Sequence, residues 1–509
     1  MPTTIGGLDL GSFVRIPGEA VFVAGLAIIL RDRPRQIVAA LVGVALGLLV
    51  ILKILDMGFH ETLARPFDPV MDWTFVGAGV EFITSTFGDV GGIGVIVLVV
   101  VLIVAVPVVT TLSVLRLMRL MVRHHTAATA GVGVAATAWI ACAAVGAQLV
   151  PGVPVAGMGT VKLAAKRIPK IRASLNDDRA FAAASRVDAF RDTPGDQLLT
   201  GLRGKDFMLT FIESYGRTAT ETPEVRALAA AGNQRLKKAG FQSRTAFLTS
   251  STAGGGSWLA HSTLLSGLWV NNQQRYKQLV ATDRLTLNRA FQRAGWRSVA
   301  VVPGVVRKWP EAKFFGYDKV YTSKDLGYAG PRFGWSTMPD QYTLEQFEKL
   351  EHSTPGRGPL MVEMPLLSSH APWAPIPKMV GWNELGNGTV YNTIEAEGKS
   401  QGDVWKDPKN VRTEYRRSIE YSFEALISYV EKYGDDKLVL VFLGDHQPAP
   451  IATGNSPNRD VPITVVARDK KVLDRFSAMN WQEGLLPNAQ APVSPMSSFR
   501  DRFLTAFAK

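Results

Sequence analysis

The sequence predicts an α/β fold class: an N-terminal α-helical transmembrane bundle followed by an α/β domain with a mostly parallel central sheet. Two observations lead to this prediction. Long apolar stretches occur only within the first 150 of the 509 residues, and a helix that crosses a membrane needs ~20 mostly apolar residues. In the remainder, short apolar runs alternate with helical patterns, which is typical of buried parallel strands with helices on both faces.

The first 150 residues contain four stretches that we expect to span the membrane. They are residues 16–30, 36–55, 91–115 and 130–150. Residues 75–87 are too short to span, and we expect an interfacial or re-entrant helix there. The predicted parts of the chain are an anchor of about four spans at 1–150, a helical connector next to the membrane at 151–200, and an α/β domain at 201–509.

Basic residues in the loops set the expected orientation. Those at 31–35 and at 116–125 fill two short loops, which lie on the same side if there are four spans. The positive-inside rule assigns that side to the cytoplasm. The domain at 201–509 is then extracytoplasmic, on a multi-pass protein of the cytoplasmic (inner) membrane. A fifth span at 75–87 would place the two loops on opposite faces. Five basic residues after the last span would have to bind outer lipid headgroups: Lys162, Lys166, Arg167, Lys170 and Arg172.

The charge of the protein lies on its polar part. Residues 1–150 carry nine basic and nine acidic side chains, so the formal net charge of +12 belongs to residues 151–509. Such a surface suits an anionic membrane, an acidic polymer or nucleic acid. The sequence has no zinc-finger, helix-turn-helix or RNA-binding motif, so we expect no nucleic-acid partner. The single cysteine, Cys142, excludes an intramolecular disulfide and a cysteine-based metal site.

Five apolar runs predict the strands of the sheet: residues 207–212, 298–302, 360–364, 438–443 and 463–466. Helical patterns between them predict helices at 222–239, 283–294 and 411–433. Ligands of open α/β sheets bind beyond the carboxyl ends of the strands. Chemically active side chains follow three of the runs there: Glu213, His370, and the pair Asp445 and His446. One such residue alone would be taken for a helix cap or a structural histidine, but three at equivalent positions predict a functional site.

A glycine-rich segment supplies a candidate nucleophile. Residues 249–267 read TSSTAGGGSWLAHSTLLSG, with three glycines directly before Ser257 and an apolar helix start after it. The N-terminus of a helix favours phosphate because its N–H groups are unpaired and it carries partial positive charge. A hydroxyl group there can attack phosphorus if a metal lowers its pKa. The alternative is a flexible glycine loop before an ordinary helix.

Four motifs together resemble the sulfatase-like branch of the alkaline phosphatase superfamily. They are Glu213-Ser214-Tyr215, the segment from Ser257 to Gly267, Ser369-His370, and Gly444-Asp445-His446. Within that branch the chain is most similar to membrane-anchored phosphoglycerol transferases of the lipoteichoic acid synthase type. The resemblance covers about residues 200–470 and implies a sulfatase-like domain behind a multi-span anchor.

The resemblance also implies roles for individual residues. By position, Glu213, Asp445 and His446 would hold one divalent cation, with the hydroxyl of Ser257 as the fourth ligand. Mn²⁺ is the expected ion, and Zn²⁺ or Mg²⁺ is the alternative. A catalytic His370 would contact the phosphate or protonate the leaving group. His261 occupies the place where sulfatases keep a basic residue, and is the third expected catalytic residue.

The sequence departs from the family at the nucleophile. The related transferases usually present a threonine, so Thr249 and Thr252 remain alternatives to Ser257. Sulfatases need a proline and an arginine after the residue that becomes formylglycine, and both are absent here. We therefore expect an unmodified Ser257, which disfavours hydrolysis of sulfate esters. A single cysteine argues against the phosphoethanolamine transferases, which carry several disulfides.

The expected function is that of a metal-dependent transferase in cell-envelope biogenesis. It would move a phosphoglycerol-type headgroup from an anionic membrane phospholipid to a glycan or lipid-linked acceptor through a phosphoserine intermediate. One alternative is a phosphodiesterase, phosphatase or sulfatase-type hydrolase that uses water at the same site. Another is a membrane-anchored binding protein without catalytic activity.

Overall fold

The computed structural model describes residues 15–69, 72–150, 153–159, 165, 169, 177–306, 308–454, 456 and 458–508, without the side chains at 74–79, 81–89, 149 and 150. The basic residues predicted to follow the last span, at 162–172, lie outside this description. The chain divides into two compact units, Met1–Asp178 and Arg179–Lys509. This boundary falls inside the segment 151–200, and the three-part division given above stays a prediction.

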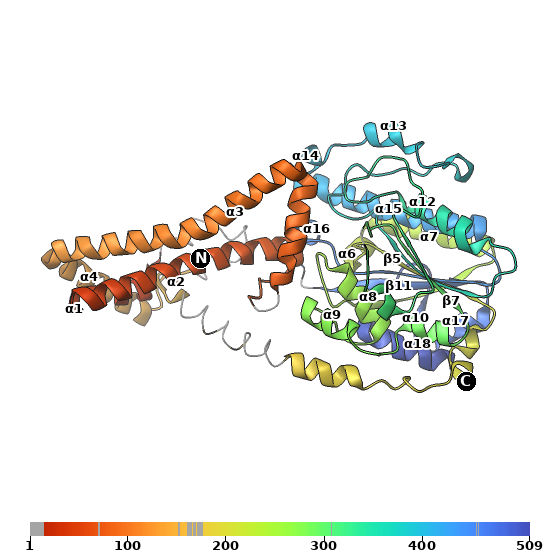
Figure 1. Cartoon of the computed structure of the whole chain (residues 1–509), viewed down its shortest axis with the longest axis horizontal. Helices are drawn as coiled ribbons and strands as arrows, with labels where there is room; N and C mark the ends of the chain where they lie inside the picture. The colour runs from red at the N-terminus through yellow and green to blue at the C-terminus, as the bar shows by residue number, and fades with distance from the viewer. Residues whose placement is uncertain are drawn as a thin grey trace. The chain divides into compact units, whose positions relative to one another are not determined.

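The first unit is built from helices (Figure 1). They are α1 (Gly18–Ile29), α2 (Asp32–Leu63), α3 (Phe75–Arg123) and α4 (His125–Ala144). Within the described residues, three helical segments are long and apolar enough to cross a membrane: Asp32–Leu63, Val90–Arg123 and His125–Ala144. Helix α1 is apolar but has only 12 residues. The span predicted at residues 16–30 therefore stays a prediction.

Residues 75–87 are helical, but they continue directly into the following span, and the interfacial or re-entrant placement predicted for them stays a prediction. The backbone is helical without interruption from Phe75 to Arg123. The physical reason is the absence of a helix breaker: the first proline of this stretch is Pro107. The glycines at 91 and 92 each disfavour a helix by only ~1 kcal/mol, which a long apolar helix tolerates.

Helices α2 and α3 approach each other closely at two glycines. A Cβ atom at Gly43 would lie 2.4 Å from Thr111 Cα, and one at Gly47 would lie 2.5 Å from Pro107 Cα. The Oγ1 atom of Thr110 also donates a hydrogen bond of 2.9 Å to the Gly43 carbonyl. Two glycines four residues apart are typical of membrane helix pairs whose backbones are in contact.

The second unit is an α/β domain. Among the described residues its sheet has nine strands: β5 (Asp206–Ile212), β6 (Gln242–Thr249), β7 (Arg297–Val302), β8 (Lys319–Thr322), β9 (Leu360–Leu366), β10 (Leu438–Gly444), β11 (Asp460–Ala467), β12 (Gln482–Glu483) and β13 (Val493–Pro495). Their order is β12-β6-β11-β10-β5-β9-β7-β8, and β13 pairs with β6. From β10 to β8 neighbouring strands are parallel, whereas β11 is antiparallel to both β10 and β6. The predicted mostly parallel sheet is confirmed, and each of the five apolar runs lies in a strand.

Helices cover both faces of this sheet (Figure 1). The helices of this unit are α6 (Arg217–Thr220), α7 (Pro223–Lys238), α8 (Ser257–Ser266), α9 (Gln273–Val280), α10 (Leu287–Arg293), α11 (Ala312–Phe315), α12 (Asp340–Phe347), α13 (Tyr391–Ala396), α14 (Gln401–Val404), α15 (Pro408–Tyr433), α16 (Pro450–Thr453), α17 (Lys470–Ser477) and α18 (Phe499–Phe507). Side chains from α8, α10, α17 and α18 form one core with one face of the sheet, and α7, α12 and α15 form a second core with the other.

The alternation of side chains along the strands decides which residues face α8. In β5, Leu209 and Phe211 belong to the core under α8, whereas Met208 and Ile212 belong to the opposite core. Successive side chains of a strand point to opposite faces. Glu213 follows Phe211 by two residues, and Leu443 of β10 pairs with Phe211. The carboxylates just beyond β5 and β10 are therefore directed toward the α8 face.

Candidate metal and nucleophile site

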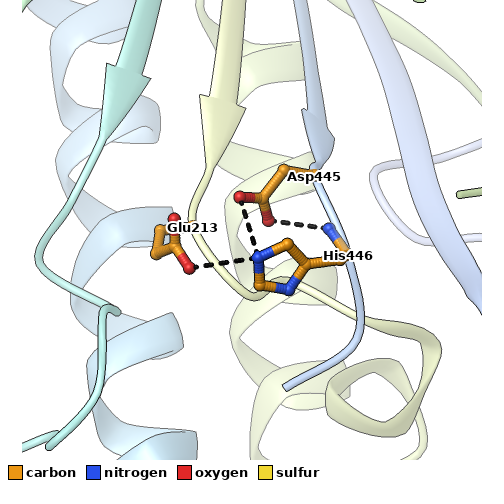
Figure 2. A group of neighbouring side chains, drawn as sticks. All are labelled: Glu213, Asp445 and His446. Atoms are coloured by element: carbon orange, nitrogen blue, oxygen red, sulfur yellow. Dashed lines mark hydrogen bonds and ion pairs between the residues drawn. The ribbon is translucent and has the colours of Figure 1, made fainter. Parts of the chain in front are cut away.

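Three predicted ligands meet at the ends of β5 and β10 (Figure 2). One ligand atom each from Glu213, Asp445 and His446 lies within 4.8 Å of the others. All three residues are buried, with exposed fractions of 6% for Glu213 and 1% for each of the other two. The two strands run parallel, and their last residues, Ile212 and Gly444, are paired. This register brings Glu213 and Asp445, which are 232 positions apart in the sequence, into one cluster.

Hydrogen bonds orient the side chains of His446 and Asp445. The Nδ1 atom of His446 lies 2.9 Å from the Gln447 carbonyl oxygen, which can only accept, so Nδ1 carries the proton. In the neutral ring the Nε2 atom then offers a lone pair, 3.5 Å from Glu213 Oε1 and 3.4 Å from Asp445 Oδ2. Asp445 Oδ1 accepts the backbone N–H groups of Ser214 and His446. Its Oδ2 atom is buried and has no hydrogen-bond donor among the described residues.

These observations fit a divalent cation. Two carboxylates, a neutral imidazole nitrogen and a hydroxyl group form an oxygen-rich donor set, which suits Mn²⁺, Zn²⁺ or Mg²⁺ and not a soft metal. A buried carboxylate oxygen without a hydrogen bond costs free energy unless a ligand satisfies it. Asp445 Oδ2 is such an atom at the centre of the cluster.

The ionisation of the cluster is strongly perturbed. Burial opposes the charged form of Glu213, but the charges of His446 and His370 outweigh burial and lower the pKa of Glu213 to about 2. Burial and the charge of Glu213 raise the pKa of Asp445 to about 6, against the effect of His446 and His261. The pKa of His446 is raised although burial lowers it, because Asp445 and Glu213 are so close. A cation would replace the proton that these crowded groups otherwise share.

Ser257 lies directly against this cluster. It is the first residue of α8, and the three preceding glycines have positive φ angles of 73°, 156° and 83°. Such angles need glycine, and they turn the chain so that the helix begins at the serine. Ser257 Oγ donates a hydrogen bond of 2.9 Å to Glu213 Oε2 and lies 3.3 Å from His446 Nε2.

The other two candidate nucleophiles are placed differently. The hydroxyl group of Thr249 donates to Asp460 Oδ1 at 2.9 Å, at the end of β6. The Thr252 hydroxyl group is buried and has no hydrogen-bond partner in the described part of the chain. The geometry therefore favours Ser257, because its hydroxyl group contacts both Glu213 and His446.

His370 is held on a loop after β9. The hydroxyl group of Ser369 donates a 2.6 Å hydrogen bond to the Glu213 carbonyl and ties this loop to the end of β5. His370 Nδ1 lies 2.5 Å from the Ala371 carbonyl oxygen, and the ring stacks on Trp335 with 5.6 Å between centroids. The nitrogen left for other partners is therefore Nε2. The charge of His370 also contributes to the low pKa of Glu213, so the two side chains are within electrostatic reach.

His261 lies on the second turn of α8 and has a partner that the sequence analysis misses. Its Nδ1 atom is 3.4 Å from Glu363 Oε1, and its ring stacks on Phe211 with 3.7 Å between centroids. Glu363 stands in the middle of β9, inside the run LMVEM that predicts the strand. A charged residue inside a buried apolar run is rare unless it is paired. The position of Glu363 in this run is therefore the feature of the sequence that indicates a buried partner.

Sequence comparisons identify no relative of the chain. A scan against protein-family models finds no match, and a search of curated proteins finds none either.

Comparison with solved structures finds remote likenesses. One is the lipoteichoic acid synthase LtaP from Listeria monocytogenes, with 14% identity and a TM-score of 0.40 over 61% of this chain and 74% of that one. A second is the Streptococcus pyogenes phosphoglycerol transferase GacH in complex with sn-glycerol-1-phosphate, with 13% identity and a TM-score of 0.38 over 65% and 91%. A third is the periplasmic domain of EptC from Escherichia coli, with 11% identity and a TM-score of 0.39 over 60% and 82%.

Two of these structures have names of the kind that the sequence motifs resemble, a lipoteichoic acid synthase and a phosphoglycerol transferase. The TM-scores are below 0.5 and the identities below 15%. The roles of residues are therefore taken from the geometry of this chain alone.

Proposed function

We propose that the protein is a metal-dependent, membrane-anchored transferase. It moves a phosphoglycerol-type headgroup from an anionic membrane phospholipid to a hydroxyl group of a glycan or lipid-linked acceptor in cell-envelope biogenesis. The observation that carries the proposal is that Ser257 Oγ lies within hydrogen-bonding distance of both Glu213 and His446. A hydroxyl group at a helix N-terminus, beside a buried cluster of ligand atoms, is suited to nucleophilic attack on phosphorus.

Four side chains would hold the metal: Glu213, Asp445, His446 and Ser257. Bound there, a divalent cation supplies positive charge that favours the deprotonated nucleophile and the negative charge developing on the phosphate. We propose Mn²⁺ as the native ion, with Zn²⁺ and Mg²⁺ as the alternatives that its donor set accommodates.

The reaction has two steps. In the first, Ser257 Oγ loses its proton to solvent and attacks phosphorus, the bond from phosphorus to the lipid alcohol breaks, and a phosphoserine diester forms. His370 carries a proton of its own at Nε2 and donates it to the lipid alcohol as that alcohol leaves. In the second step an acceptor hydroxyl group attacks phosphorus and gives its proton to His370 Nε2. The bond from phosphorus to Oγ breaks, and Ser257 regains a proton from solvent.

Headgroup release by the full chain in lipid vesicles tests this proposal. Vesicles containing phosphatidylglycerol are incubated with metal-loaded protein, and the products are read by mass spectrometry. We expect Ser257→Ala to abolish release, while Thr252→Ala and Thr249→Ala retain it and serve as matched hydroxyl controls. Full activity of Ser257→Ala would overturn the assigned nucleophile. Release of free glycerol phosphate in the presence of a polyol acceptor, without a transferred product, would identify a hydrolase instead.

We also propose that the unit Arg179–Lys509 lies outside the cytoplasm, on a multi-pass protein of the cytoplasmic membrane. The proposal is supported by the basic residues at 31–35 and 116–125, and by three helices long and apolar enough to cross a membrane. A reporter that is active only outside the cytoplasm, fused after residue 509, is expected to be active. A cytoplasmic reporter fused at the same place is expected to be silent, and the reverse pattern would refute the orientation.

A further inference from the structure

Glu363 is a buried carboxylate in the centre of the sheet. It lies in the middle of β9, pairs in register with Leu209 of β5 and Ala300 of β7, and is 3% exposed. A carboxylate in such an environment costs several kcal/mol unless donors surround it. The side chains that contact Glu363 therefore indicate its role.

Three side chains surround this carboxylate, one from α8, one from α10 and one from the connection between α11 and β8. Asn288 of α10 donates to Glu363 Oε2 at 3.1 Å, and the hydroxyl group of Tyr317 donates to the same oxygen. The other oxygen, Oε1, faces Nδ1 of His261 at 3.4 Å. Burial and the charge of Glu363 raise the pKa of Tyr317 well above its usual range, so its hydroxyl group remains a donor at neutral pH. Two neutral donors thus fix one oxygen and leave the other for His261.

His261 is turned toward the catalytic side of α8. It follows Ser257 by four residues, so both lie on one helix face. Side chains of a helix lean toward its N-terminus, which here is Ser257 itself. The His261 ring also lies flat on Phe211, which points to the same face of the sheet as Glu213 two residues further on. The ring is therefore one side-chain layer away from Glu213.

The two nitrogens of His261 are in different situations. Nδ1 faces the Glu363 carboxylate, which can only accept, so Nδ1 carries a proton. Nε2 is buried and has no hydrogen-bond partner among the described residues. The stacking on Phe211 and the contact with Glu363 hold the ring in one plane and one orientation. A buried, oriented nitrogen without a partner beside a nucleophile is a site for a substrate oxygen.

We propose that Glu363, held by hydrogen bonds from Tyr317 and Asn288, is a positioning residue that orients His261. With both ring nitrogens protonated, the Nε2–H group of His261 then donates a hydrogen bond to an oxygen of the phosphate group at Ser257. This inference deepens the proposed function and rests on it for the identity of the phosphate group. Glu363 itself does not contact the substrate. Its effect is transmitted through the ring of His261, which acts as the contacting residue.

A double-mutant cycle tests this coupling on the full, metal-loaded chain. Binding of inorganic phosphate, measured by calorimetry, and headgroup release are compared for wild type, Glu363→Gln, His261→Ala and the double variant. Substitution of a residue that orients a ligating side chain typically lowers affinity or activity ~10–100-fold. We expect Glu363→Gln and His261→Ala each to weaken phosphate binding and lower kcat by about that factor. The double variant should be no worse than His261→Ala alone, because Glu363 acts only through that ring.

A matched control separates this role from a loss of stability. Glu351 is also buried and accepts a hydrogen bond from a tyrosine, Tyr321, but it pairs with Arg297 away from the cluster at Ser257. Glu351→Gln is expected to leave phosphate binding unchanged even if it lowers the melting temperature. If Glu363→Gln fails to fold, Tyr317→Phe serves instead, because it removes only one of the hydrogen bonds to Glu363. We expect it to weaken phosphate binding less than His261→Ala does.

The outcomes distinguish this inference from the proposed function. Three outcomes would each overturn the positioning role. The effects of the two single variants could multiply independently in the double variant, phosphate binding could be unchanged in Glu363→Gln and Tyr317→Phe, or the wild type could bind no phosphate. Coupled losses of phosphate binding without headgroup release from any lipid would support the positioning role and count against the proposed transferase.

Discussion

Gly444 is packed against the backbone of Tyr215. A Cβ atom at residue 444 would lie 1.8 Å from the Tyr215 carbonyl oxygen. Gly444 is the last residue of β10, and Asp445 follows it directly. Just beyond the end of β5, Ser214 has a positive φ of 56°, and its N–H group donates to Asp445 Oδ1 at 2.8 Å. The close approach of the two strand ends is what lets Glu213 and Asp445 share a site.

Gly444→Ala should therefore damage the site without removing a ligand. The added methyl group must push the end of β10 away from Tyr215, since a carbonyl group of the backbone cannot yield as a flexible side chain can. Overpacking typically costs ~1–3 kcal/mol of unfolding free energy. We expect a lower melting temperature and a loss of bound metal by elemental analysis. Gly402→Ala is the control, because a Cβ atom at residue 402 meets nothing within 4 Å. This variant should keep the melting temperature and the metal content of the wild type.

Removal of the metal should destabilise the wild-type chain but not a variant that cannot bind it. A ligand that binds only the folded state stabilises it, by ~2.7 kcal/mol at one hundred times its dissociation constant. We expect a chelator to lower the melting temperature of the wild type and to leave that of Asp445→Asn unchanged. His370→Gln, which keeps the three clustered ligands, should bind metal as the wild type does. Equal metal content in Asp445→Asn would show that the ligand set is wrong.

Much of the sheet could be predicted because its central strands are continuous apolar runs. All seven residues of β5 and of β10 are buried, which is the pattern of a strand covered on both faces. Strand β6 was missed because its sequence, QSRTAFLT, mixes polar and apolar residues. It pairs with β11, β12 and β13, and such tertiary pairing overrides local preference.

The site could be predicted where its residues follow a strand or a run of glycines. Glu213 and Asp445 stand just beyond strand ends, where ligands of open sheets bind, and Ser257 is marked by three glycines. The environment of His261 could not be predicted in this way. Glu363, Tyr317 and Asn288 lie within or between elements, and they meet only because β9 and α10 pack against α8. No spacing in the sequence expresses that contact.

The membrane unit offers a test of helix packing. Substitution of glycine by alanine inside a helix normally favours the helix by ~1 kcal/mol. At Gly43 and Gly47 the added methyl group would instead collide with the backbone of α3. We expect Gly43→Ala and Gly47→Ala to lower the melting temperature in detergent. Gly58→Ala, on the same helix with nothing within 4 Å, should leave it unchanged or raise it, and a loss as large as at Gly43 would contradict the close contact.

A buried ion pair makes the stability of the α/β unit depend on pH. Asp188 and Arg500 form an ion pair of 2.8 Å, and both side chains are fully buried. Burial alone would raise the pKa of Asp188, but the hydrogen bonds and charge of Arg500 lower it below the usual value. For a carboxyl group whose pKa is lower in the folded state, the stabilisation is complete above its unfolded value of ~3.9 and is lost as pH falls through the folded value.

Asp188→Asn should therefore be less stable than the wild type at neutral pH, and the difference should shrink below about pH 4. Removal of one partner from a buried ion pair typically costs ~3–5 kcal/mol. The contacts that Arg500 keeps with the Asp501 carboxylate and the Leu285 carbonyl oxygen should place the loss at the lower end of that range. Chemical unfolding between pH 7 and pH 3 measures both effects. Asp283→Asn removes the partner of Arg191 in an ion pair whose carboxylate is 77% exposed, and it should change stability by less than ~1 kcal/mol at any of these pH values. Only a group that is present in one of the two proteins can make the difference between their unfolding free energies depend on pH. A difference between Asp188→Asn and the wild type that stays constant from pH 7 to pH 3 would therefore show that Asp188 is not the titrating group.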